Sequence, residues 1–507
     1  MITLTPGSVT LADLRAIWNG APVALDDGAW PAVEAAAASI ERILESGRTV
    51  YGVNTGFGLL AQTRIPDDRL ADLQRNLILS HSCGLGEALE PRIVRLLIVL
   101  KIIGLARGHS GVRPLVIERL LTLLQADALP VIPAQGSVGA SGDLAPLAHL
   151  AAAMLGEGRM LLDGESVPAA AALARLHLDP LELGPKEGLA LINGTQASTA
   201  IALDALFAGE RVFGAAVVTG ALSLEAFKGT DAAFDARLHE ARGQPGQIAV
   251  AGVLRTLLAD SAVKASHAGC GKVQDPYSFR CQPQVMGASL DLLRNAARTL
   301  EIEANAVTDN PLLFAGEDDA VSGGNFHAQP VAFAADIIAI ALCEVGSICE
   351  RRVAVLVDPK MSGLPPFLVA DSGVNSGFMI AQVTAAALVS ENKTLAFPAS
   401  VDSIPTSANQ EDHVSMATHG ARKAGRIARN AGGVVGIELL AAVQGLDFHA
   451  PLTTSPSLDP VVKAVRAAVP HYAADRYLAD ELAWAQQAVL RGLAADHVPM
   501  LEALLAA

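Results

Sequence analysis

Apolar residues recur at helical spacing along most of this chain, and the segments that carry this pattern lengthen after about residue 200. In the first part the period predicts four helices, at 70–79, 92–107, 112–127 and 144–155. In the second part it predicts six longer or equally apolar helices, at 197–224, 248–258, 284–305, 330–355, 377–394 and 415–444. The turn-rich residues 157–167 predict a hairpin.

This pattern predicts a mainly α-helical fold class with two domains. Residues 1–200 form the first domain, which carries polar and glycine-rich loops. Residues 201–507 form the second, a bundle of long helices followed by C-terminal helices. No short-period internal repeat is present.

Composition supports helices that are buried on several sides. The 507 residues are 51% hydrophobic but only 4% aromatic, and much of the excess is alanine, which favours helix and close helix packing. We therefore expect the helices to pack inside an oligomer. The most apolar long segment, 331–349, contains Asp336 and Glu344, which are costly in lipid, so we expect no membrane span.

The charge and cysteine content narrow the class of protein further. A net charge of −15 argues against nucleic acid as a partner. The five cysteines form no CxxC pair, which favours a reduced, cytoplasmic protein. The twelve histidines form no HxH or HExxH motif, so we expect no metal site, with a structural metal near Asp412 and His413 as the alternative.

The segment GSVGASGDLAPLAHL, residues 136–150, contains the tripeptide Ala140-Ser141-Gly142. Attack of the Gly142 nitrogen on the Ala140 carbonyl would close a five-membered ring, and loss of water from the ring and from Ser141 would leave a methylidene electrophile. Gly142 has no Cβ, so the backbone can fold tightly enough for this attack. The alternative is an ordinary glycine-serine loop, in which Asp143 opens the following helix.

The fifteen-residue segment resembles the signature of the aromatic amino acid ammonia-lyases, and the likeness runs from about residue 45 to the end of the chain. The resemblance implies a mainly α fold with a central bundle and a homotetramer whose subunits share active sites. It also implies a prosthetic group, 4-methylidene-imidazole-5-one (MIO), made from Ala140, Ser141 and Gly142, with no external cofactor.

The resemblance also assigns roles to residues in the polar loops of the first part. Tyr51, in YGVNTG, is the base that removes the β-proton, which requires activation because a free tyrosine has a pKa of roughly 10. Ser80-His81 resembles the histidine-specific members, and the His81 imidazole can exchange hydrogen bonds with a substrate imidazole. Asn193, in the predicted loop 186–196, contacts the prosthetic ring and the substrate's amino-acid end, although a helix-capping asparagine is the alternative.

A second set of candidate residues lies in VQDPYSFRCQPQ, residues 273–284. Gln274, Tyr277 and Arg280 recur every three residues and share a face if the segment is helical, while its two prolines favour a short turn. Arg280 is suited to a bidentate pair with the substrate carboxylate. The resemblance places Tyr277 beside the prosthetic group and has Gln274 orient it or the carboxylate. A surface arginine in a solvent-facing loop is the alternative.

The remaining candidates are Phe326, which by resemblance packs near the reactive ring, and Glu411, which can hold an imidazole N–H. We expect His413 and residues 308–311 to be structural. Together with His81, Glu411 favours deamination of L-histidine to trans-urocanate and ammonia, the first step of histidine degradation. Phenylalanine or tyrosine as substrate, an aminomutase, a fumarase-type lyase and a non-catalytic binding protein are the alternatives. Whether the electrophile adds to the amine or to the ring stays open.

Overall fold

The computed structural model describes residues 1–56, 64–267, 273–316, 319–501 and 504. It is mainly helical and confirms the predicted fold class. The chain forms two compact units, each built from three separate segments. The first unit comprises Met1–Asp204, Ala297–Asp336 and Pro398–Arg422. The second comprises Ala205–Ala296, Ile337–Phe397 and Lys423–Ala507.

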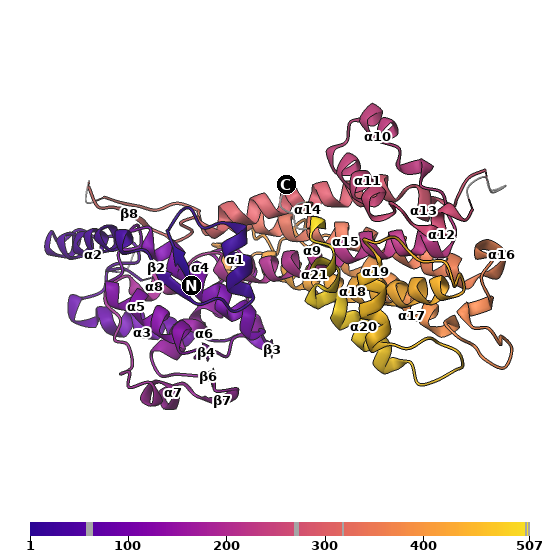
Figure 1. Cartoon of the computed structure of the whole chain (residues 1–507). Helices are drawn as coiled ribbons and strands as arrows, with labels where there is room; N and C mark the ends of the chain where they lie inside the picture. Colours follow the sequence, from indigo (N-terminus) through magenta and orange to yellow (C-terminus); the bar gives the residue numbers. More distant parts are fainter. Residues whose placement is uncertain (57–63, 268–272, 317–318, 502–503, 505–507) are drawn as a thin grey trace. The chain divides into compact units, whose positions relative to one another are not determined.

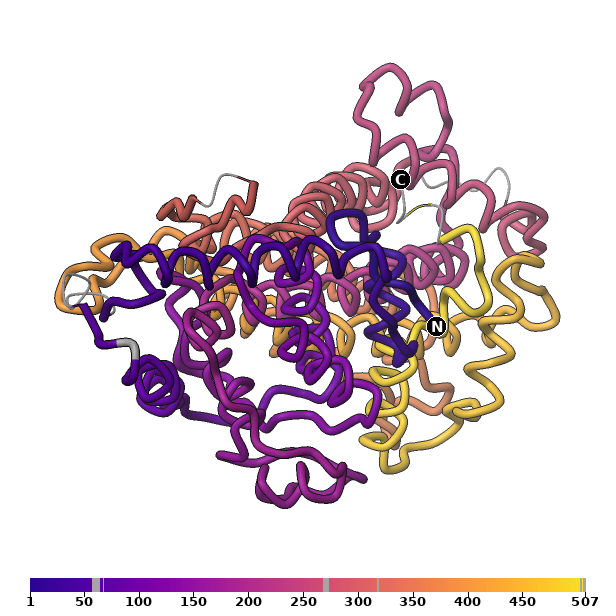
Figure 2. The backbone as a smooth tube through the Cα atoms, turned by 90° about the vertical axis from the view of Figure 1, so that its left-hand side faces the viewer, coloured from indigo at the N-terminus to yellow at the C-terminus, as the bar shows by residue number. Residues whose placement is uncertain are grey.

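Helices α1 to α8 lie wholly in the first unit (Figures 1 and 2). They are α1 (Leu11–Trp18), α2 (Trp30–Glu45), α3 (Leu70–His81), α4 (Pro91–Ala106), α5 (Pro114–Gln125), α6 (Leu144–Met154), α7 (Ala169–Arg175) and α8 (Glu187–Ile192). Single 3₁₀ turns cover Asp27–Ala29, Asp67–Arg69 and Ser407–Asn409. Helices α3, α6 and α8 pack on one another and so bring three loops of the first unit together.

Short strands pair in the first unit. Strand β1 (Ile2–Leu4) runs parallel to β2 (Val23–Leu25), with Ile2 opposite Val23. The other pairs are antiparallel: β3 (Leu85–Ala88) with β5 (Pro133–Gln135), β4 (Leu129–Pro130) with β6 (Arg159–Leu162), β6 with β7 (Glu165–Pro168), and β8 (Leu312–Phe314) with β9 (Asp319–Val321). The pairing of β6 with β7 forms the hairpin predicted for 157–167.

Four helices of 23 to 31 residues contain boundaries between the units: α9 (Gln196–Ala226), α14 (Gln282–Ala304), α15 (Gln329–Val357) and α18 (Ala417–Asp447). The second unit adds α10 (Ala236–Arg242), α11 (Pro245–Leu257), α12 (Ala262–Ala265), α13 (Tyr277–Arg280), α16 (Pro359–Ser362), α17 (Met379–Leu395), α19 (Asp459–Ala468), α20 (Ala479–Arg491) and α21 (Leu493–His497). Its 3₁₀ turns are Ala232–Phe234 and Pro366–Leu368. The observed helices include all ten that the apolar period predicts.

A buried ion pair connects three of these long helices within the second unit. The guanidinium of Arg352 on α15 pairs with the carboxylate of Glu438 on α18. Thr219 and Ser223 on α9 donate to the same carboxylate, at 2.9 and 2.7 Å. Because each charge is paired and hydrogen-bonded, the bundle core accommodates it without an unpaired ion.

Helix α15 is the one described helix that is long and apolar enough to cross a membrane by length and composition. Two thirds of its most apolar stretch, 67%, is buried inside the structure. It contains Asp336, whose carboxylate accepts hydrogen bonds from the backbone N–H groups of Ala399 and Ser400 at 3.1 and 2.8 Å. These features are those of a core helix in a globular protein.

The segment 186–196, predicted as a loop, contains helix α8, so that prediction was wrong in part. All six residues of α8 are buried, and Lys186 immediately before it has a left-handed backbone with φ of 67°. A helix of six residues is too short to display a period of 3.6, and its flanking polar residues therefore determined the sequence-based prediction.

Candidate functional site

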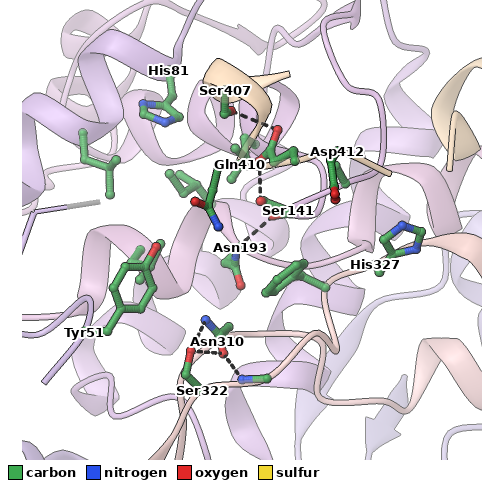
Figure 3. Close-up of a pocket in the computed structure, with 18 of the residues that line it drawn as sticks. Tyr51, His81, Ser141, Asn193, Asn310, Ser322, His327, Ser407, Gln410 and Asp412 are labelled. Carbon is green, nitrogen blue, oxygen red and sulfur yellow. Dashed lines mark hydrogen bonds between the residues drawn. The ribbon is translucent and has the colours of Figure 1, made fainter. Parts of the chain in front are cut away.

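A pocket of about 1190 Å³ opens in the first unit, and all its lining residues belong to that unit (Figure 3). Loops at the ends of α3, α6, α8 and β9 and the turn 406–411 contribute to it. The pocket brings together seven of the residues that the sequence nominated: Tyr51, His81, Ala140, Ser141, Asn193, Phe326 and Glu411.

The tripeptide 140–142 forms part of the pocket wall. The backbone at Gly142 and at the preceding Gly139 adopts a left-handed conformation that favours glycine. Gly139 and Gly142 have φ of 63° and 82°. Gly142 bridges to Gly194, and a Cβ on Gly142 would lie 2.5 Å from the nitrogen and oxygen of Gly194. The Asp143 N–H donates to the same Gly194 oxygen at 2.8 Å. This close approach of two backbones, beside the buried Ala140, is compatible with the cyclisation that the sequence predicts for this segment.

Asp143 is the N-cap residue immediately before helix α6 and so opens that helix as predicted, but its carboxylate makes no capping hydrogen bond to the helix backbone. One oxygen accepts from the hydroxyls of Ser137 and Thr418, at 2.7 and 2.9 Å. The other accepts from the N–H and hydroxyl of Ser198, at 2.7 and 2.9 Å. Because both oxygens are occupied, this fully buried side chain ties the tripeptide loop to two other segments.

Asn193 ends helix α8 rather than starting the next helix, so it is not the N-terminal cap that was the alternative. Its amide nitrogen donates to the Ser141 carbonyl at 2.9 Å. Its side-chain oxygen is buried and has no hydrogen-bond partner in the described parts of the chain. The side chain therefore holds the tripeptide and keeps one acceptor available for a ligand.

Lys101 binds the backbone of Asn193, and the sequence analysis did not predict any role for it. Its Nζ donates to the carbonyls of Ala190 and Asn193, at 3.0 and 2.8 Å. Burial lowers the pKa of Lys101 to about 7, with Asp309 opposing the shift and Lys186 adding to it. A single lysine within the apolar segment 91–106 was the available signal.

His81 is the last residue of α3, and its ring Nδ1 lies 3.1 Å from the hydroxyl of Ser80. Burial lowers the pKa of His81, while the Leu77 backbone and the charge of Glu411 oppose this shift. The imidazole is therefore neutral near pH 7. A neutral imidazole has one donor and one acceptor nitrogen, as ring-to-ring recognition requires.

Glu411 is directed into the pocket by a tight turn. Ser407, Ala408 and Asn409 all have left-handed backbones, with φ of 52°, 54° and 67°. Thr406 and Glu411 then pair through their backbones, at 3.0 and 3.3 Å. The carboxylate accepts hydrogen bonds from Thr406 and, at 3.0 Å, from Ser407 on one oxygen, and from the Ser141 hydroxyl on the other. Figure 3 draws the hydrogen bonds made by Ser407 and by Ser141.

Other pocket residues were expected to be only structural. Asn310 lines the pocket and accepts a hydrogen bond from the Gly323 N–H at 2.7 Å. His413 also lines it, and its ring stacks on His327 with centroids 5.8 Å apart. Within the described residues, no group of three or more His, Cys, Asp or Glu side chains is arranged to hold a metal ion.

Gln274, Tyr277 and Arg280 belong to the second unit and do not line the pocket. Tyr277 and Arg280 begin and end the short helix α13, and the Arg280 guanidinium lies 4.5 Å from the centroid of the Tyr277 ring. Tyr277 is 70% exposed, and the buried Arg280 Nε has no partner among the residues described. The catalytic and carboxylate-binding roles of these three residues stay predictions.

The sequence model of a family described as aromatic amino acid lyase matches residues 9–467. The chain belongs to this family, whose members use MIO.

Within the family, the chain is 59% identical over 482 residues to a histidine ammonia-lyase of Paracidovorax citrulli (strain AAC00-1), covering 95% of this chain and 94% of that protein. The solved histidine ammonia-lyase of Trypanosoma cruzi matches with a TM-score of 0.92 and 41% identity, covering 100% and 97% of the two chains. A tyrosine aminomutase from Streptomyces globisporus matches with a TM-score of 0.93 and 36% identity, covering 98% and 99%.

Proposed function

We propose that this chain deaminates L-histidine, without oxidation, to trans-urocanate and ammonia. The observation that carries the proposal is the position of His81 and Glu411 in one pocket with Ala140, Ser141 and Asn193. A neutral imidazole and a carboxylate can together recognise the two ring nitrogens of histidine, whereas a phenyl ring offers no hydrogen-bonding partner to either. The similar proteins named as histidine ammonia-lyases support the same substrate.

Each remaining part of the substrate has a proposed partner in this chain. The unpaired Asn193 oxygen accepts a hydrogen bond from the substrate ammonium. Tyr51, which lines the same pocket, takes the β-proton. Arg280 binds the carboxylate with two parallel hydrogen bonds, while Gln274 and Tyr277 assist. Phe326 packs against the reactive centre from the pocket wall.

The electrophile that this reaction needs is MIO formed from Ala140, Ser141 and Gly142. When formed, the group supplies an electron-poor carbon that no ordinary side chain provides. Asn193 and the Gly194 backbone hold the tripeptide in place for it. The positive end of the α6 dipole lies directly after Gly142 and favours electron flow toward this segment.

We further propose a homotetramer in which Gln274, Tyr277 and Arg280 complete the pocket of another subunit. Helix α17 supports association, because it exposes Ile380 and Val383 to 63% and 52%. Complementation tests this arrangement. Ser141→Ala and Arg280→Ala should each be inactive alone, and their mixed tetramers should regain part of the activity. Mixed tetramers without any activity would reject shared sites.

A cytoplasmic location is also proposed. The four described cysteines, Cys83, Cys281, Cys343 and Cys349, are free thiols, which suits a reducing compartment. Fractionation of cells that produce the native protein would test this, and recovery of the enzyme outside the cytoplasm would reject it.

The experiment for the proposed function combines intact mass with product analysis. The purified chain should weigh two waters less than its translated sequence, and Ser141→Ala should lose this deficit and nearly all turnover while remaining folded. Histidine should yield urocanate and ammonia. Turnover of tyrosine in preference to histidine, or a product that keeps its amine as in an aminomutase, would reject the assignment.

A further inference from the structure

Glu411 makes one contact that ring recognition does not use: it accepts a hydrogen bond from the hydroxyl of Ser141. That hydroxyl is lost when the prosthetic group forms. We propose that Glu411 also serves as the acid that removes the Ser141 hydroxyl as water during maturation, before it binds any substrate. This inference rests on the proposed function, because it concerns the formation of MIO in this chain.

The geometry singles out this carboxyl group. Of its two oxygens, one is held by the Thr406 and Ser407 hydroxyls and the other faces Ser141. Thr406 and Ser407 therefore fix the rotation of the carboxyl group. The neighbouring acid, Asp143, has both oxygens occupied by Ser137, Thr418 and Ser198. Among the described residues, Glu411 is the one acid with a hydrogen bond to the Ser141 hydroxyl.

Maturation releases two waters, and the two steps need different atoms. In the first, a bond forms from the Gly142 nitrogen to the Ala140 carbonyl carbon. The Ala140 oxygen leaves with the hydrogens of the Gly142 and Ser141 nitrogens. In the second, the Cβ–Oγ bond of Ser141 breaks and its electron pair leaves with the oxygen. The electron pair of the Cα–H bond becomes the Cα=Cβ double bond.

A hydroxide is a poor leaving group, so the second step needs a proton on the oxygen as the bond breaks. For this step the Glu411 carboxylate first takes a proton from solvent and then delivers it to Oγ, and water leaves. The proton released from Cα passes to solvent and balances the one that Glu411 took up, so the segment loses one water with no net change in protons and Glu411 is again a carboxylate. The oxygen of Glu411 that held the hydroxyl is then available for the substrate ring. One residue thus acts in maturation first and in recognition afterwards.

Glu411→Gln tests the inference, because glutamine has nearly the same shape but cannot supply a carboxyl proton. Newly synthesised chain is pulse-labelled before it matures, and its intact mass is followed with time. General acids contribute about 10²–10⁴-fold, so the second water should leave about 100-fold more slowly and a species lacking one water should accumulate. Asp412→Asn is the matched control, because it removes a carboxyl group from the adjacent, exposed position.

Asp412→Asn should reach the two-water deficit at the wild-type rate. Glu411→Gln reaching it at that rate would overturn the inference, even if the variant does not turn over histidine. A wild-type chain without any water deficit would instead reject MIO and so the proposed function. If Glu411→Gln does not fold, Thr406→Val and Ser407→Ala decide the question. Slower loss of the second water in both supports the inference, and wild-type rates in both overturn it.

Discussion

Replacing Lys101 with methionine should change how the protein's stability depends on pH. The ordinary lysine pKa of 10.5 applies to the unfolded chain, and the folded-state pKa of Lys101 is about 7. Between these values the unfolded chain binds one more proton than the folded chain, so wild-type stability rises as pH rises from 7 toward 10.5. The cost of burying this amine is fully present below pH 7.

The magnitude follows from the same pKa difference. Each pH unit within the window corresponds to about 1.4 kcal/mol, so wild type should gain about 3–4 kcal/mol from pH 7 to pH 10 through this group. The neutral amine still has two N–H donors, one for each of the Ala190 and Asn193 carbonyls. Lys101→Met escapes the pH-dependent cost, but it leaves these two buried carbonyls without a donor at about 1–3 kcal/mol each.

Wild type and Lys101→Met should therefore have similar stability near pH 7, and wild type should become the more stable of the two at higher pH. With an unfolding entropy of about 2 cal/mol/K per residue, the melting-temperature difference should widen by about 3 °C between pH 7 and pH 10. The assay is thermal melting of both proteins across this range. Lys463→Met, at a lysine whose side chain is 76% exposed, is the control and should give a constant offset. Parallel curves for wild type and Lys101→Met would refute the reasoning.

Three further substitutions test other contacts. Gly142→Ala would place a Cβ 2.5 Å from the Gly194 backbone at a φ of 82°, so the chain should show no water deficit by intact mass; a two-water deficit would contradict this. Lys186→Met breaks a buried pair with Asp309 at 2.7 Å and should cost about 3–5 kcal/mol, seen as a lower melting temperature; a shift below about 1 °C would reject it. His81→Leu removes a ring partner and should lower kcat/KM for histidine by about 10- to 100-fold while leaving the water deficit intact. Unchanged kinetics would remove His81 from substrate recognition.

The sequence predicted the long helices well because their apolar period persists over many turns. Helix α8 was missed because six residues are too few to show that period. The pocket residues that could be predicted, such as His81 and Glu411, belong to polar clusters that contrast with an apolar chain. The resemblance to a family then gave them roles.

Other features could not be read from the sequence. The role of Lys101 could be recognised only in the structure, where its amine donates hydrogen bonds to two backbone carbonyls. In the sequence, an isolated lysine in an apolar segment does not show which groups it binds. The hydrogen bonds from Thr406 and Ser407 to Glu411 depend on three consecutive residues with left-handed backbones. Two of the three, a serine and an alanine, are residue types that rarely adopt this conformation, so the sequence did not predict the turn. The sequence correctly predicted that Asp143 opens a helix, but it could not show that the Asp143 carboxylate binds Ser198 and Thr418, which are remote in the chain.

The backbone bridge between Gly142 and Gly194 links reactivity to correct folding. Gly194, which contacts the tripeptide, lies about fifty positions downstream of it. Under the proposed maturation, a newly made polypeptide would therefore lack the electrophile until these two segments have folded against each other. A misfolded copy would lack the electrophile for the same reason. The intact mass of the chain would then report whether this part of the protein has folded correctly.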